Sequence, residues 1–225
     1  MTELKRSTNP LIVPQGVAKV PLEDLAAPVT LRRARTTGKR ELRELRARQT
    51  AMEAIAGLDH QVEIFGFTKG QFSLLDLIAA CLEYTGAARV TVSTWTAARH
   101  EIQAMAQFKG AGLITEARWL VDYTFARRDP AAAAQIRETF GVGSVRVANT
   151  HSKIALFEND EWDLVLRSSM NLNMNPRFED FTLAHDPEMM AFLRKIFDEI
   201  WSHQEAAFGE KTKPGEFARH FRDNM

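Results

Sequence analysis

Strand-like and helical segments alternate along the middle of the chain, and this order restricts the possible folds more than any other feature of the sequence. The apolar periodicity predicts strands and helices in turn at 62–67, 73–86, 89–95, 97–108, 119–125 and 131–140. Ser73 with Asp76 has the pattern of a capping box, and Pro130 follows the N-cap residue Asp129. A β-α-β-α-β order favours a largely parallel sheet with helices on its faces, so we expect an α/β fold.

After Gly141 the pattern changes mainly to strands. Four more are predicted, at 144–148, 151–157, 162–167 and 181–184. The polar turn 158–161 joins two of them into a hairpin. Asp186 and Pro187 start a last helix that reaches about residue 208, with an apolar stripe typical of a helix packed on a core. The strands of the hairpin make the predicted sheet mixed.

The N-terminal part of the chain differs from the rest in charge. Residues 1–57 hold 11 basic and 6 acidic side chains, whereas residues 58–225 hold 18 basic and 23 acidic ones, although the whole chain has a formal net charge of zero. We therefore expect a basic extension (1–57), a main domain (58–209) and a polar tail (210–225). Prolines indicate an extended lead in residues 1–30, and apolar spacing predicts a basic amphipathic helix at about 39–56.

Two interpretations of this basic helix stay open. It packs against the main domain or a second subunit, or its cations contact the phosphate backbone of a nucleic acid. The candidate nucleic-acid-binding residues are Arg32, Arg33, Arg35, Lys39, Arg40 and Arg43.

Several classes of protein are disfavoured by the composition. The single cysteine, Cys81, excludes an intramolecular disulfide framework and a cysteine-rich zinc site. The first residues lack the apolar core of a signal peptide, and the most apolar stretch, 74–82, is short and contains Asp76. We therefore expect a cytoplasmic protein with no contact to a membrane.

The polar residues in and after the hairpin are the best candidates for chemistry. The six histidines show no pair at metal-ligand spacing, so we expect no metal site and no cofactor. The candidate residues are His151, Lys153, Ser169, Asn171, Asn173 and Glu179. Strand alternation puts His151 and Lys153 on one face, the return strand brings Ser169 and Asn171 back toward them, and Glu179 is within reach of the imidazole. Such a set suits an anionic phosphoryl centre.

His151-x-Lys153 followed by Ser168-Ser169-x-Asn171 resembles the HxK…GSxN signature of the phospholipase D superfamily. The resemblance implies a phospholipase D-like domain and a histidine that attacks phosphorus to form a phosphohistidine. It implies catalytic roles for His151, Lys153 and Glu179, and phosphate binding by Lys153, Ser169, Asn171 and Asn173. A second histidine, from a second copy of the motif, protonates the leaving oxygen.

The resemblance covers roughly residues 60–203 and includes a single copy of the motif. A complete site therefore implies a homodimer, as in the bacterial endonucleases that such single-copy chains resemble more than lipases. Two positions depart from the family pattern: Glu158 stands where an aspartate is usual, and Ser168 stands where a glycine is usual.

The predicted function is a metal-independent phosphodiesterase, a nuclease acting on DNA or RNA and most simply on DNA. A phospholipase or phosphatidyltransferase of the same fold, and a catalytically inactive nucleic-acid-binding or assembly protein, remain alternatives. So do structural roles for single residues: His151 as a strand histidine bonded to Glu179, Lys153 as a sheet-edge cation, and the asparagines as loop residues. Arg177 is open to pairing with Glu179 or to contacting phosphate. Three residues are expected to end a strand beside the site: Ser93, Trp95 and Thr96.

Overall fold

The structure is a computed structural model, and it describes residues 38–44, 50–174 and 177–203. The extended lead predicted for residues 1–30, the polar tail 210–225, the candidate cations Arg32, Arg33 and Arg35, and Asn175 lie outside these residues.

A single mixed sheet organises the described residues. Its eight strands are β1 (Lys39–Glu44), β2 (Val62–Thr68), β3 (Ala88–Thr94), β4 (Ile114–Asp122), β5 (Val145–Ala148), β6 (Ile154–Glu158), β7 (Asp163–Ser168) and β8 (Glu179–His185). They lie in the order β1-β2-β8-β7-β6-β3-β4-β5. The β3-β4-β5 part and the β1-β2 pair are parallel, and the other neighbours are antiparallel. The α/β class expected from the sequence is confirmed.

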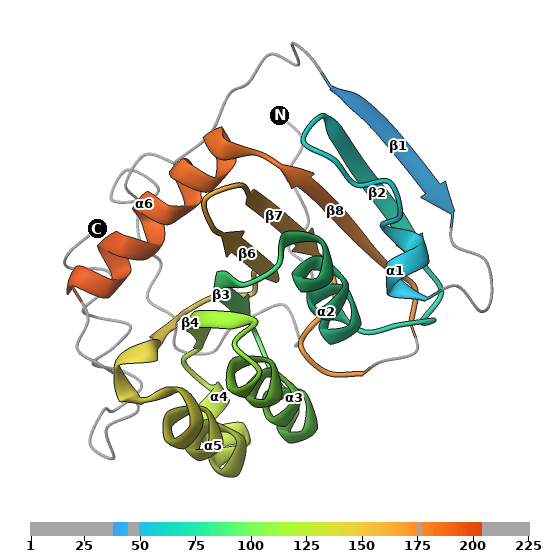
Figure 1. Cartoon of the computed structure of the whole chain (residues 1–225). Helices are drawn as coiled ribbons and strands as arrows, with labels where there is room; N and C mark the ends of the chain where they lie inside the picture. Colours follow the sequence, from blue (N-terminus) through green and yellow to red (C-terminus); the bar gives the residue numbers. More distant parts are fainter. Residues whose placement is uncertain (1–37, 45–49, 175–176, 204–225) are drawn as a thin grey trace, which may run out of the picture. The chain divides into compact units, whose positions relative to one another are not determined.

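Helices cover both faces of this sheet. On one face lie α2 (Leu74–Thr85), α3 (Arg99–Gly110) and α5 (Pro130–Phe140), which Figure 1 shows with α2 and α3 in front of the strands. The short helices α1 (Ala51–Ala54) and α4 (Phe125–Arg128) add residues to the core on the same side, and a 3-10 turn (Val142–Ser144) precedes β5. On the other face lies α6 (Pro187–His203). Among the described residues no helix is both long and apolar enough to cross a bilayer.

Strand alternation divides the buried side chains between two cores. On β4, Trp119 and Val121 join the large core under α2, α3 and α5, whereas Leu120 joins a smaller core under α6. Met190 and Phe197 supply the α6 side of that smaller core. This is the core-facing stripe predicted for the last helix.

The helix predicted at 39–56 is wrong. Residues 39–44 form β1, which pairs in parallel with β2 through the register Lys39↔Val62 to Glu44↔Phe67, and only 51–54 are helical. Arg43 donates to the carbonyl oxygens of Ala54 (2.8 Å) and Ala56 (2.9 Å), which ties the strand to the residues around α1. The edge of β2 has unpaired backbone N–H and C=O groups that residues 39–44 can bond to as a strand. This pairing outweighs the weak helical preference of the local sequence. Of the described residues before Gly57, 39–44 are therefore an edge strand of the sheet, and 51–54 form a single short helix.

Two strand boundaries also differ from those predicted. Residues 151–153 are irregular, and β6 begins only at Ile154. The strand expected at 119–125 is β4, which runs from Ile114 to Asp122, and Phe125 starts α4.

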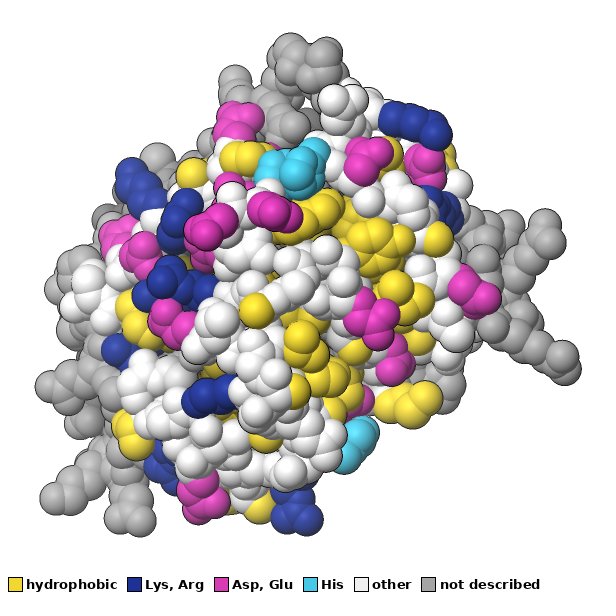
Figure 2. All heavy atoms as spheres, viewed as in Figure 1, with side chains coloured by type: hydrophobic (Ala, Val, Ile, Leu, Met, Phe, Trp, Pro, Cys, Tyr) yellow, Lys and Arg dark blue, Asp and Glu magenta, His cyan; other side chains and the backbone are white. Residues whose placement is uncertain are grey.

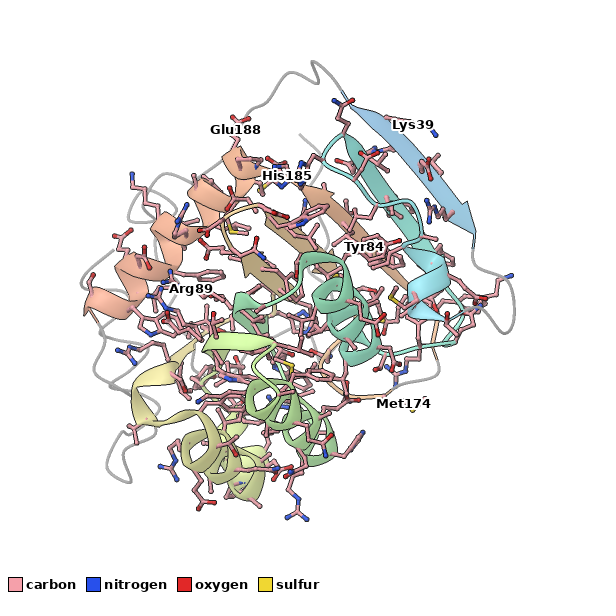
Figure 3. All side chains as sticks on the ribbon, in the orientation of Figure 1. Lys39, Tyr84, Arg89, Met174, His185 and Glu188 are labelled. Atoms are coloured by element: carbon pink, nitrogen blue, oxygen red, sulfur yellow. The ribbon has the colours of Figure 1, made fainter. Side chains whose placement is uncertain are left out.

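The strand directions gather the candidate residues at one edge, which we call the His151 edge. It is formed by the C-terminal ends of β2, β3, β4 and β7 and the N-terminal ends of β6 and β8. His151, the residues after Ser168, Glu179 and Trp95 all adjoin these strand ends. Figure 3 shows that His185 lies at the other end of β8, far from Met174 in the loop after β7.

Candidate active site

His151 and Lys153 contact each other in the irregular segment before β6. Lys153 Nζ lies 3.0 Å from Nδ1 and 3.3 Å from Nε2 of the His151 ring. The His151 residue is exposed, whereas Lys153 is 9% exposed. An ammonium group has only donors, so the contact requires a ring nitrogen that accepts. Burial lowers the pKa of Lys153 from its usual 10.5, and the negative charge of Glu179 opposes that shift.

The residue between them fixes this segment to the sheet. Ser152 Oγ lies 2.6 Å from Ser93 Oγ and 2.8 Å from Thr150 Oγ1. The backbone N–H of Ser168 also donates to the carbonyl of Lys153 (3.0 Å). Ser93 is fully buried, so it does not line the site but holds Ser152, the residue between His151 and Lys153, in place.

Ser169 and Glu179 form a second contact at the same edge. The Ser169 hydroxyl donates to Glu179 Oε2, and the Asp180 N–H donates to Ser169 Oγ (3.0 Å). The expected bond between Glu179 and the imidazole is replaced by this one: in the described part of the chain, His151 has contacts with Lys153 and Trp95, and Glu179 is bonded to Ser169. Glu179 therefore acts on Lys153 through its charge.

The two departures from the family pattern have structural roles. Ser168 Oγ donates to the Asp180 carbonyl (2.7 Å) and accepts from the Met170 N–H (3.0 Å), so it fastens the loop to β8. Glu158 pairs with Arg194 of α6 (3.1 Å) at the end of β6, remote from His151. Neither substitution removes a group from the His151 edge.

The asparagines lie in a segment that docks beside the end of β3. Leu172 donates its N–H to Thr94 Oγ1 (3.3 Å) and accepts from the Ala98 N–H (2.8 Å). Asn171 and Asn173 are half-buried on either side of it. The buried Asn171 Oδ1 has no hydrogen-bond partner among the described residues, and such an orphaned polar atom beside a site is a natural contact for a ligand.

Trp95 and Arg128 extend the site along β3 and β4. The Trp95 ring centroid is 5.8 Å from that of His151, and the Arg128 guanidinium carbon is 3.7 Å from the centre of the Trp95 ring. The sequence placed Trp95 beside the site but missed Arg128. The only local signal was the basic pair before the Asp129-Pro130 cap, which is as typical of a helix C-terminus as of a ligand contact.

The described cations of β1 are already paired within the chain. Lys39 lies 2.6 Å from Glu41, Arg40 pairs with Glu63, and Arg43 pairs with Glu41. On the face shown in Figure 2, basic and acidic side chains are interspersed. Lys39, Arg40 and Arg43 therefore serve the β1–β2 edge, and nothing in their contacts singles them out for phosphate binding.

Metal ligands are not clustered in the part of the chain that the structure describes: no group of three or more His, Cys, Asp or Glu side chains is placed to hold an ion. Cys81 is buried in α2, and burial raises the pKa of its thiol.

Two other histidines lie at the edge opposite His151. The rings of His60 and His185 are 4.3 Å apart, and Trp162 packs against both. His185 Nδ1 accepts the Asp163 N–H (3.2 Å), a bond that needs the neutral ring. Burial and then the neighbouring His60 lower the pKa of His185 below its usual 6.5, against opposing charges on Asp163 and Asp186.

A pH dependence of stability follows for this pair. Because the folded protein binds this proton more weakly than the unfolded chain, His185 destabilises the fold progressively as pH falls from about 6.5 through the lower folded pKa. We expect His185→Gln to flatten the fall of Tm over that interval, measured by circular dichroism melting. The same slope in the wild type and the variant would contradict this, and His100→Gln, an exposed histidine on α3, is the matched control.

Comparisons with known proteins give distant structural similarities. No protein-family model matches the sequence, and no curated protein matches it. The fold is similar to that of NucT from Helicobacter pylori, with 14% identity and a TM-score of 0.45 over 62% of this chain and 96% of that one. It is similar to polyphosphate kinase from Porphyromonas gingivalis, with 12% identity and a TM-score of 0.46 over 65% of this chain and 27% of that one.

A third similar structure is TrmBL2, an archaeal chromatin protein described as showing a novel mode of DNA binding. The identity is 12% and the TM-score 0.42, over 64% of this chain and 54% of that one. With TM-scores below 0.5, these three similarities say nothing of what this chain does, so its chemistry has to be inferred from its own side chains.

Proposed function

We propose that this protein is a metal-independent phosphodiesterase that cleaves nucleic acid, with His151 as its nucleophile. The observation that carries the proposal is the contact of an exposed imidazole with a buried ammonium group, 3.0 Å apart, at a sheet edge that also holds Ser169 and Glu179. A fixed cation next to a nucleophile supplies the charge stabilisation that a pentacovalent phosphoryl transition state needs. Lys153 supplies it without a metal.

The reaction proceeds in two displacements. A ring nitrogen of His151 attacks phosphorus, the N–P bond forms, and the P–O bond to the leaving alcohol breaks while a second histidine gives that oxygen its proton. Water then attacks phosphorus, the N–P bond breaks, and the second histidine takes the proton of the water. Lys153 contacts the phosphoryl oxygens throughout, and the side-chain NH₂ of Asn171 donates a hydrogen bond to them.

The second histidine comes from a second copy of the chain. Among the histidines whose side chains the structure describes, His60 and His185 lie at the opposite edge, and His100, in the first turn of α3, contacts Glu101 (3.4 Å). We therefore propose a homodimer in which the His151 edges of two copies face each other, so that each imidazole acts as nucleophile or as acid.

Cleavage without metal tests this function. Labelled single- and double-stranded DNA, RNA and a phospholipid are incubated with the wild type in EDTA, and the mass of the protein is measured by size exclusion with light scattering. We expect cleavage of nucleic acid by a dimer, at a rate unchanged by EDTA. Activity that EDTA abolishes and Mg²⁺ restores would contradict the proposal. A folded protein that binds DNA and cleaves none of these diesters would be a binding protein instead.

A further inference from the structure

We propose that Trp95 and Arg128 form a nucleobase platform beside His151, and that the protein therefore acts on unpaired, single-stranded nucleic acid. This inference rests on the proposed function for the phosphate site and adds the class of strand that the site accepts. Its starting point is the contact between the Trp95 and His151 rings, 5.8 Å apart between centroids.

Trp95 lies where the base of a bound nucleotide could stack on its ring. It follows β3 directly, at the His151 edge, and its side chain is half-buried, so part of the indole is accessible. A nucleotide whose phosphate touches His151 and Lys153 carries its base one sugar away, and the 5.8 Å between the rings is a separation of that order. Stacking on an aromatic side chain is the usual way in which proteins bind unpaired bases without reading their sequence.

Arg128 holds the indole in place. Its guanidinium lies over one face of the ring at 3.7 Å. It donates to the Trp95 carbonyl (2.6 Å) and to Thr124 Oγ1 (2.9 Å) and lies 3.8 Å from Asp122. Because three acceptors fix the guanidinium, it holds the indole ring in one orientation. A base that stacks on the other face of the ring then binds without the entropy cost of ordering the Trp95 side chain. Arg128 also adds a positive charge next to His151 and Lys153, the proposed phosphate-binding residues, which we call the phosphate centre.

Aromatic surface lies on the other side of the phosphate centre as well. Phe178 precedes Glu179, is 68% exposed, and stacks on Phe67 of β2, with ring centroids 5.8 Å apart. Along the His151 edge the order is thus an aromatic pair, the phosphate centre and Trp95. Bases in a duplex have both faces covered by their neighbours and cannot stack on these rings, so the arrangement fits a single strand.

The test compares matched probes with and without bases. In a His151→Ala background, to prevent cleavage, fluorescence anisotropy measures the binding of an oligothymidylate and of an abasic strand with the same length and charge. Trp95→Ala is added to this background. Trp201→Ala is the control, because Trp201 also lies near two guanidinium groups (5.4 and 5.2 Å) but bonds to Gly143 at the opposite edge.

We expect Trp95→Ala to weaken binding of the oligothymidylate by about tenfold, the size of one lost stacking contact, and to leave binding of the abasic strand within about twofold. Trp95→Phe should restore most of the loss, and the control should change neither probe. Equal weakening for both strands, or no change for either, would overturn the platform.

Activity separates this inference from the proposed function. With the wild-type His151, Trp95→Ala should lower kcat/KM for thymidine 5′-(p-nitrophenyl phosphate) by a larger factor than kcat/KM for methyl p-nitrophenyl phosphate, which carries no base. A parallel loss on both would make Trp95 a support of His151 and overturn the platform. If the wild type hydrolyses neither compound, the phosphodiesterase proposal fails, and the binding result alone decides the platform.

Discussion

We expect His151→Ala to abolish phosphodiester cleavage, with a fall in kcat on the order of 10⁴-fold or more, because the variant lacks the ring nitrogen that forms the N–P bond in the proposed mechanism. The fold should persist, since the imidazole is exposed and its contacts are with Lys153 and Trp95. The measurement is single-turnover cleavage of a labelled strand in EDTA, with circular dichroism to confirm folding. His60→Gln, at the opposite edge, should keep full activity.

Dimers that combine wild-type and His151→Ala chains test whether the two copies share one active site. If each site needs His151 from both copies, wild type co-expressed with an equal amount of His151→Ala yields about one quarter of the dimers with two imidazoles, and activity falls to about one quarter. If each copy works alone, activity falls only to about one half. The second result would leave His151 as a nucleophile and would exclude a shared site.

Lys153→Met should lower kcat by about 10²- to 10³-fold, the usual effect of removing one preorganised charge from a transition state. Stability should change little, because Lys153 is 9% exposed and a methionine of similar volume avoids the cost of a buried charge. Lys195→Met, an exposed lysine on α6, is the matched control. A normal kcat in Lys153→Met would contradict the proposal that Lys153 stabilises the charge of the transition state.

The pH profile of the wild type adds a check on the same residue. Burial lowers the pKa of Lys153 below 10.5, so the ammonium loses its proton at a lower pH than an exposed lysine does. We expect activity to fall as pH rises through that lowered pKa, and we expect Lys153→Arg to move this fall to higher pH, because arginine stays charged. If activity falls at the same pH in Lys153→Arg as in the wild type, the loss of activity at high pH is due to a group other than Lys153.

Features within a few residues of one another were predictable. The capping box of Ser73 and Asp76 and the cap at Asp129-Pro130 start α2 and α5 as expected, since each involves bonds that span three residues. The His151–Lys153 pair was also predictable, because two residues at a spacing of two stay close even though the segment is irregular. The residues after the hairpin return to them because β6 and β7 pair antiparallel.

The remainder depended on which strands become neighbours. The sequence by itself determined the α/β class, the caps and the local His151–Lys153 pair. Only the tertiary structure decided that residues 39–44 form a strand on the edge of β2, that Glu179 bonds to Ser169 instead of His151, and that Arg128 covers Trp95 from 33 residues away. The physical reason is range: caps and turns are set by bonds between near neighbours in the chain, whereas these contacts exist only once sheet register and loop closure bring distant segments to one edge.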